Sequence, residues 1–289
     1  EALSRGVEKD CDVDEALNYL KHIENKDAMA VGSDELVRVT HAIMNPPFSI
    51  WGSPKSDYWK SGKVNAAGVI FDHYARRLPE GREFSAILPD VLRSGTRYEG
   101  FRGFISNRAD AVCEIWGRFN NKTDVDVFIL SGVLSSKIKN KILWSKDFGK
   151  YVPISSYFDV RVGPLVAYRD EERGDLVPYY HPRNTPAWEC IDKPSEFREF
   201  SGKLLLPPFV LVKRTSSPSD KYRASATIIN LKVPVAVENH MLVLTPKNGS
   251  LKDCFKLLKT LRESKTNDFL NERCRMRHLT VKVVKDIPF

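Results

Sequence analysis

Long apolar runs are missing from this 289-residue chain, and so is any secretory signal. No stretch approaches the ~18 consecutive apolar residues that a membrane span needs. The first residues, EALSRGVEKDCDVDEAL, are acidic and contain no apolar segment of the kind that directs secretion. The chain also lacks an initial Met, so we expect a fragment or a processed product.

Cysteine is scarce and scattered along the sequence. The five cysteines form no C-x-x-C pair, which fits a reducing compartment and argues against a disulfide framework and against structural zinc. The six histidines show no spacing typical of metal ligands. We therefore expect no metal site in this protein.

Acidic residues are sparse only in the second half of the chain. Residues 1–150 hold 22 Lys and Arg against 21 Asp and Glu, a net charge of +1. Residues 151–289 hold 23 against 16, a net charge of +7, so nearly all of the overall +8 lies there. Such a bias suits a polyanionic partner, and nucleic acid is the usual one. A basic face that only maintains solubility is the alternative.

Strand and helix patterns alternate through the first half. Buried strands are predicted over 28–32, 37–44, 83–89, 110–117 and 125–133, and helices over 14–25, 65–78 and 98–107. This rhythm predicts an α/β fold with a parallel sheet. From about residue 145 prolines recur among short strands, and one long helix is predicted over 250–274. We place a domain boundary between residues 147 and 148.

The predicted strand 37–44 is followed by Asn45, Pro46, Pro47 and Phe48. Two prolines cannot sit in a central strand, because each lacks the N–H that the sheet requires. The segment should leave the sheet as a stiff loop at the carboxyl end of the strand, where ligands bind in open parallel sheets. Its side-chain and carbonyl oxygens would then be rigid acceptors beside the flat ring of Phe48.

Two fixed acceptors and a stacking ring suit an exocyclic amino group on a planar heterocycle. The lone pair of such a nitrogen is delocalised into the ring, which makes the amine a poor nucleophile. Acceptors that hold both N–H bonds stabilise the charge that develops during attack and favour a tetrahedral nitrogen. An aromatic ring holds a base that has been pulled out of a duplex.

The Asn-Pro-Pro-Phe motif after an apolar strand resembles the gamma class of N6-adenine DNA methyltransferases, the Taq-type branch of restriction–modification systems. NAAGVIFDHYARRLPEGREFSAILPDVLRSGTRYEGFRGFI, RFNNKTDVDVFIL, LPPFVLVKRTSS and RHLTVKVVKDIPF are similar to later segments of that family. The resemblance implies a Rossmann-like S-adenosylmethionine-dependent sheet, incomplete at its N-terminus, over 1–147. It also implies a mixed α+β target-recognition domain over 148–289, double-stranded DNA as the partner, and the cytoplasm of a bacterium or archaeon.

The resemblance assigns roles to five of these residues. Asn45, Pro46, Pro47 and Phe48 would form the catalytic set. Within it, the Asn45 side chain and the Pro46 carbonyl would accept hydrogen bonds from the adenine amino group. Phe48 would stack on the flipped base, and Phe119 would be the second aromatic residue against that base. Ordinary packing in the core is the alternative for Phe119.

The resemblance also implies a cofactor site. Asp34 would bind the adenine of S-adenosylmethionine and Asp12 its ribose, with Asp14 as the other alignment for the ribose acid. Asp34 as a helix cap and Asp12 as a solvated turn residue are the alternatives. The family has a glycine-rich loop before the ribose acid, but no G-x-G occurs in this sequence. Either that part has been removed, or a partner chain supplies it, or the protein binds DNA without catalysis.

Cations and hydroxyls in the second half are typical of a DNA-contacting surface. The candidates are Lys213, Arg214, Thr215, Ser216, Lys221, Arg223, Arg275 and Arg277, with Arg273 and His278 nearby. A solvated hairpin tip and the electrostatic capping of a helix end are the alternatives. Two rival functions stay open: an RNA guanine-N2 methyltransferase, which also uses Asn-Pro-Pro-Phe, and a non-catalytic DNA-specificity subunit.

Overall fold

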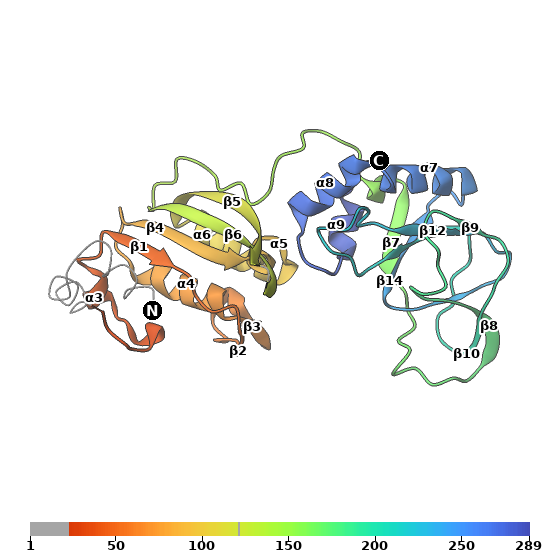
Figure 1. The fold of residues 1–289 in the computed structure, drawn as a ribbon, viewed down its shortest axis with the longest axis horizontal. Helices are drawn as coiled ribbons and strands as arrows, with labels where there is room; N and C mark the ends of the chain where they lie inside the picture. Colours follow the sequence, from red (N-terminus) through yellow and green to blue (C-terminus); the bar gives the residue numbers. More distant parts are fainter. Residues whose placement is uncertain (1–22, 121) are drawn as a thin grey trace.

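The computed structural model describes residues 23–120 and 122–289, arranged as two lobes that lie side by side (Figure 1). We call residues 23–144 the N-terminal lobe and residues 148–289 the C-terminal lobe. The predicted helix over 14–25 lies almost wholly outside the described residues, as do Asp12 and Asp14. The predicted domain boundary stays a prediction.

The N-terminal lobe is built on a mixed four-stranded sheet in the order β1-β4-β6-β5. β1 (His41–Met44) runs parallel to β4 (Glu83–Pro89), with α4 (Ala66–Arg77) in the connection between them. β6 (Thr123–Leu134) pairs antiparallel with both β4 and β5 (Ala109–Asn120). The prediction of an all-parallel sheet is therefore wrong, because β5 and β6 form a hairpin too short for a crossover.

Helices cover one face of this sheet. α4 and α6 (Glu99–Ser106) pack on it through buried residues such as Phe71, Phe101 and Ile105. α5 (Asp90–Ser94) and the 3-10 helix η3 (Thr96–Tyr98) connect β4 to α6. The opposite face carries exposed apolar side chains, with Ile43 89% and Val112 72% exposed.

The predicted elements from residue 65 to residue 134 are confirmed, and those before the motif need correction. Residues 28–32 do not form a strand, because Asp27 caps the 3-10 helix η1 (Ala28–Ala30) and accepts from the Met29 amide. The strand predicted over 37–44 is shorter, since α3 (Ser33–Leu36) precedes it and only His41–Met44 pair with β4. After the motif, β2 (Ile50–Gly52) and β3 (Lys63–Asn65) form a small hairpin that includes η2 (Asp57–Trp59).

The C-terminal lobe has two sheets and a layer of helices. The larger sheet, in the order β7-β14-β11-β12-β9, contains β7 (Phe158–Val162), β9 (Cys190–Ile191), β11 (Phe209–Lys213), β12 (Ala226–Ile229) and β14 (Met241–Pro246). The smaller sheet, in the order β10-β8-β13, contains β8 (Asp175–Tyr180), β10 (Phe197–Phe200) and β13 (Ala236–Val237).

Short helices close the C-terminal lobe, drawn in blue in Figure 1 except for η4 (Ile154–Ser156). The single helix predicted over 250–274 is two helices, α7 (Leu251–Leu261) and α8 (Ser264–Arg273). The break at Arg262 and Glu263 is held by Thr266, whose hydroxyl donates to the Thr260 carbonyl at 2.7 Å. α9 (Val281–Lys285) follows and packs near β7.

Two absences hold for residues 23–120 and 122–289. No helix in that part of the chain is both long and apolar enough to cross a membrane. No group of three or more His, Cys, Asp or Glu side chains there is placed to hold a metal ion, and the expected absence of a metal stays a prediction.

Candidate active site

The Asn-Pro-Pro-Phe segment leaves the sheet directly after β1. Asn45 and Pro47 are exposed, Pro46 is buried, and Phe48 is half-buried. Because β1 and β4 are parallel, the segment emerges at the same edge as Pro89, the last residue of β4, and Asp90, which follows it. Pro46 therefore anchors the segment while the Asn45 side chain faces solvent. We call residues 45–48 the ledge.

Asn65 fastens the ledge to the first turn of α4. Its side-chain nitrogen donates to the Phe48 carbonyl at 3.2 Å, and its side-chain oxygen accepts from the Ala67 amide at 3.0 Å as the N-cap. The Tyr98 hydroxyl accepts from the Asn65 amide at 2.9 Å. Asn65 is buried, so these bonds lie away from water. The sequence analysis missed this residue, although an Asn directly before a helix is an N-cap signal.

The two aromatic residues predicted to contact a base lie against each other. The ring centroids of Phe48 and Phe119 are 5.2 Å apart with an interplanar angle of 79°. This edge-to-face arrangement is one of the two that aromatic pairs prefer. Phe119 lies near the end of β5, beside irregular pairing with β6, and is half-buried.

A cavity of about 300 Å³ opens between the ledge and the C-terminal lobe. One wall comes from the N-terminal lobe, and the other from two segments of the C-terminal lobe. The lining residues are Phe48, Asn65, Pro89, Asp90, Val91, Arg118, Asp124, Val125, Asp126, Pro218, Arg275, Met276 and Arg277. Its volume is at the lower end for a small-ligand site.

Carboxylates on β6 hold the arginines that line this cavity. Asp126, whose side chain is 6% exposed, lies 3.5 Å from Arg118 Nε and 3.4 Å from Arg275 Nε. Asp124 pairs with Arg118 and with Arg277. Two of the residues predicted to contact DNA are therefore engaged by acids of the other lobe in this structure.

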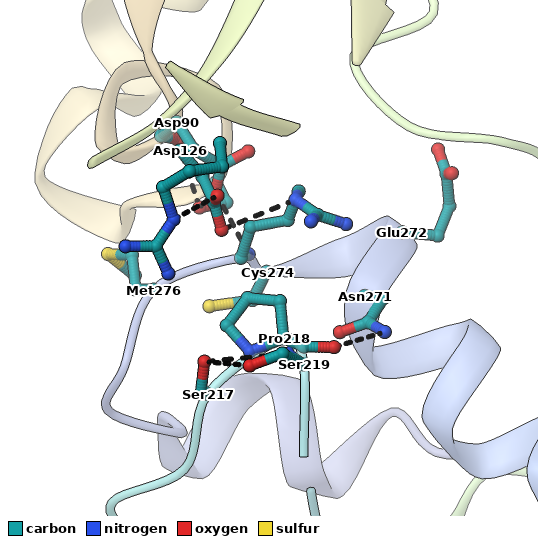
Figure 2. A network of polar contacts seen from close by, with 12 residues as sticks. Asp90, Asp126, Ser217, Pro218, Ser219, Asn271, Glu272, Cys274 and Met276 are labelled. Atoms are coloured by element: carbon teal, nitrogen blue, oxygen red, sulfur yellow. Dashed lines mark hydrogen bonds and ion pairs between the residues drawn. The ribbon is translucent and has the colours of Figure 1, made fainter. Parts of the chain in front are cut away.

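Asp90, which also lines the cavity, belongs to a network of polar contacts that joins the lobes (Figure 2). Asp90 is buried, pairs with the buried Arg93, and accepts from the Arg275 amide at 3.0 Å. Arg93 also donates to the carbonyls of Trp144 at 2.9 Å and Glu272 at 2.6 Å. Asp90 and Arg93 both lie on α5 of the N-terminal lobe, and their bonds to the Arg275 amide and the Glu272 carbonyl join the two lobes.

The other predicted DNA contacts differ in exposure. Thr215 and Lys221 are exposed, and Lys213 and Arg214 are half-buried. Ser216 is only 6% exposed, and its hydroxyl is buried, so the prediction that it contacts DNA is wrong for this structure.

Arg223 also needs correction as a DNA contact. It is 0% exposed, and burial lowers its pKa. Its guanidinium donates to the carbonyls of Leu270, Cys274 and Met276. These bonds hold the segment after α8 in place, and they leave no nitrogen on the surface for a phosphate. Arg223 therefore has a structural role.

The residues predicted to bind a cofactor are only partly described. Asp12 lies outside the described residues, and Asp34 is exposed in the first turn of α3. Asp34 is not the cap of that helix, because the cap is Gly32, whose amide donates to Glu35 Oε1 at 3.1 Å. A side chain at Gly32 would have nothing within 4 Å. Of the two residues assigned to the cofactor, the structure therefore describes only Asp34, which lies beside open space.

Comparisons with known proteins give a likeness of fold. No family model matches the chain, and no curated protein matches it. Among solved structures it is similar to the type IIL restriction-modification enzyme MmeI in complex with DNA, with a TM-score of 0.51, 10% identity, and coverage of 92% of this chain and 48% of that one. The type IIG restriction endonuclease BpuSI gives a TM-score of 0.41, 11% identity, and coverage of 91% and 48%.

The chain spans about half the length of both structures. At such low identity, the likeness to MmeI concerns the fold alone. It extends over 92% of this chain and so includes both lobes. The mixed α/β fold of this chain is therefore similar in both lobes to part of a restriction-modification enzyme.

Proposed function

We propose that this protein is a site-specific DNA adenine-N6 methyltransferase of a restriction–modification system, with S-adenosylmethionine as the methyl donor. The observation that carries the proposal is the ledge, which exposes Asn45 at the carboxyl end of β1 with Phe48 and Phe119 beside it. The likeness of fold to MmeI, an enzyme described in complex with DNA, supports the same reading.

The chemistry of the ledge concerns the target amine. The Asn45 amide oxygen and the Pro46 carbonyl accept one N–H bond each from the adenine amino group, which draws the nitrogen lone pair out of the ring. The base stacks on Phe48 once it leaves the duplex, and Phe119 meets its edge. No general base is needed before attack, because the nitrogen loses its proton after it has become cationic.

The resemblance of the sequence to N6-adenine methyltransferases suggests the cofactor, and the described residues do not. S-adenosylmethionine supplies an electrophilic methyl group to such amines. Asp34 and the proposed ribose acid Asp12 would hold it together with a glycine-rich loop from a further segment or a partner chain. The basic C-terminal lobe would bind the duplex, since residues 151–289 carry a net charge of +7.

The first test separates chemistry from binding. Asn45→Ala in the full-length protein should lower the transfer of labelled methyl groups to duplex DNA by about 100-fold or more, because it removes one acceptor from the developing charge. DNA affinity should stay within about twofold, since a neutral exposed amide contributes little to phosphate binding. Ser49→Ala, on the same loop, is the matched control. Equal losses of transfer and affinity would contradict the assigned role.

The second test follows the base. A duplex with 2-aminopurine at the target position should become more fluorescent on binding, because the base loses its stacking neighbours. Phe48→Ala should reduce that change. An unchanged signal with the unaltered protein would count against base flipping. Methyl transfer to ribosomal RNA instead of duplex DNA would favour the RNA guanine-N2 rival, and a full-length protein that binds DNA but no cofactor would favour the specificity subunit.

A further inference from the structure

A second space between the lobes, which we call the α5–α9 cleft, has a volume of about 710 Å³. α5 and α6 contribute to its wall in the N-terminal lobe, and α9 forms most of its wall in the C-terminal lobe (Figure 1). None of its lining residues also lines the cavity beside Phe48. The cleft is therefore separate from the candidate active site, and its volume is within the range of sites for small ligands.

Cations outnumber acids in the cleft. Five of its lining residues are Lys or Arg, and two are Asp or Glu. Three of the cations have carboxylate partners, in the pairs Arg93–Asp90, Lys282–Glu99 and Arg273–Asp286. The other two, Arg102 and Lys285, form no ion pair within residues 23–120 and 122–289. The cleft therefore keeps a positive charge that these side chains do not neutralise.

Arg102 forms the N-terminal side of this charge, and it is half-buried. Its Nη1 donates to the carbonyls of Leu92 and Gly95, both at 2.9 Å, which fixes the position of the guanidinium. Its Nε and Nη2 bond no group in the described part of the chain, and neither is enclosed, so a ligand in the cleft can reach them. Burial lowers the pKa of Arg102. An anion beside this guanidinium would offset the cost of removing it from water.

The opposite wall supplies groups that suit the same anion. Lys285, the last residue of α9, is exposed. The Thr280 hydroxyl accepts from the Val283 amide at 3.2 Å as the N-cap of α9, so its own proton is free to be donated. Lysine, arginine and hydroxyl groups are the side chains that hold phosphate oxygens. Trp144 and Val281, both half-buried, line the same cleft and add apolar surface.

We propose that the α5–α9 cleft binds a small organic phosphate. The phosphate group lies between Arg102 and Lys285, and the carbon skeleton lies against Trp144 and Val281. Because Arg102 belongs to α6 and Lys285 to α9, the ligand contacts both lobes at once. This site does not depend on the proposed function, since it shares no residue with the ledge or with the cavity beside Phe48.

Isothermal titration calorimetry of the full-length protein at low salt tests the site, with phenyl phosphate and inorganic phosphate as probes. Phenyl phosphate should bind more tightly by about 10-fold or more, because its ring covers apolar surface that inorganic phosphate leaves exposed. Lys285→Gln should weaken the binding of phenyl phosphate by about 10-fold, since a charge-assisted bond is lost. Lys252→Gln, an exposed residue of α7 outside the cleft, is the matched control.

Glu99→Gln should act in the opposite direction. It removes a negative charge from the cleft and frees Lys282, so the affinity for phenyl phosphate should rise by about 2- to 5-fold. The side chains of Glu99 and Lys282 are 54% and 69% exposed, so the substitution disturbs no packed core. A rise with Glu99→Gln and a fall with Lys285→Gln together locate the anion in this cleft.

Two results would overturn the proposal. The first is an unaltered protein that binds no phenyl phosphate, or a Lys285→Gln variant that binds it equally well. The second is a DNA duplex that displaces phenyl phosphate, together with a matching loss of duplex affinity in Lys285→Gln. That result would assign the two cations to the backbone of DNA instead of to a small phosphate.

Discussion

Arginine has two distinct roles in this chain, and burial separates them at the scale of single residues. Arg223 is wholly buried and donates to main-chain carbonyls after α8. The Arg277 side chain is 59% exposed and pairs with Asp124 of the other lobe. The first kind holds the backbone of the C-terminal lobe, and the second is available for exchange with another anion.

We predict that Arg223→Met lowers the free energy of unfolding by roughly 2–4 kcal/mol, since buried carbonyls lose their donor and the methionine cannot replace it. Urea denaturation followed by circular dichroism measures the change. Lys221→Met, an exposed residue two positions earlier, should stay within about 0.5 kcal/mol. A similar small effect of both substitutions would show that the buried bonds of Arg223 are dispensable.

The sequence predicted the single-residue roles that depend on local backbone restriction, and it missed those that depend on tertiary packing. The ledge was predictable because proline restricts the backbone wherever it occurs, and the restriction is local. Whether Arg223 or Lys221 meets solvent depends on the packing of α8, which is distant in sequence. The link between Asn65 and the Phe48 carbonyl is likewise a tertiary contact that no local pattern indicates.

At the scale of elements, α4 connects the sheet to the ledge. Its N-cap residue, Asn65, uses its oxygen to begin the helix and its nitrogen to hold the Phe48 carbonyl. α4 and β4 matched their predicted ranges because both have a clear apolar period and a turn between them. β1 did not match its predicted range, since four paired residues at a sheet edge leave only a weak sequence pattern. The antiparallel pairing of β5 with β6 was not predicted either, because alternation of strands and helices was taken to mean a parallel sheet.

We predict that Asn65→Asp keeps the helix cap and lowers methyl transfer by about 10-fold or more. The carboxylate still accepts from the Ala67 amide, but it repels the Phe48 carbonyl and shifts the ledge. Because Asn65 is a positioning residue, kcat should fall while DNA affinity changes little, and the buried carboxylate should also lower thermal stability. Asn65→Ala, which removes the cap as well, should also cost about 1 kcal/mol of stability. A normal kcat for Asn65→Asp would contradict the positioning role.

At the scale of the whole molecule, the two lobes meet through polar groups. The hydrophobic clusters described for the N-terminal and C-terminal lobes share no residue. Between them, Asp90 and Arg93 of the N-terminal lobe bond main-chain groups of Arg275 and Glu272, and beside the cavity Asp126 pairs with Arg275 and Asp124 with Arg277. The composition predicted the basic half of the chain, but it could not show that acids of the other half partly neutralise it.

We predict that Asp124→Asn steepens the dependence of DNA affinity on salt. Each phosphate that a free cation neutralises contributes about 0.9 to the slope of log affinity against log salt. Arg277 is paired with Asp124 and contributes less, so the substitution should increase the slope by up to about 0.9. Fluorescence anisotropy over a range of KCl concentrations measures it, with Asp159→Asn as an exposed control in the other lobe. Identical slopes would show that this ion pair does not compete with DNA.

Under the proposed function, the arginine pairs at the cavity also bear on how the protein would find its target. A cation that already has a carboxylate partner must give up that ion pair before it can neutralise a phosphate, so it contributes less to binding than a free cation does. Under the proposed function, random stretches of duplex would therefore gain little from Arg275 and Arg277, and affinity for non-target DNA would be weaker than the surplus of basic residues implies. Under the proposed function, movement between sites would be easier as a result, and DNA binding would depend less on ionic strength.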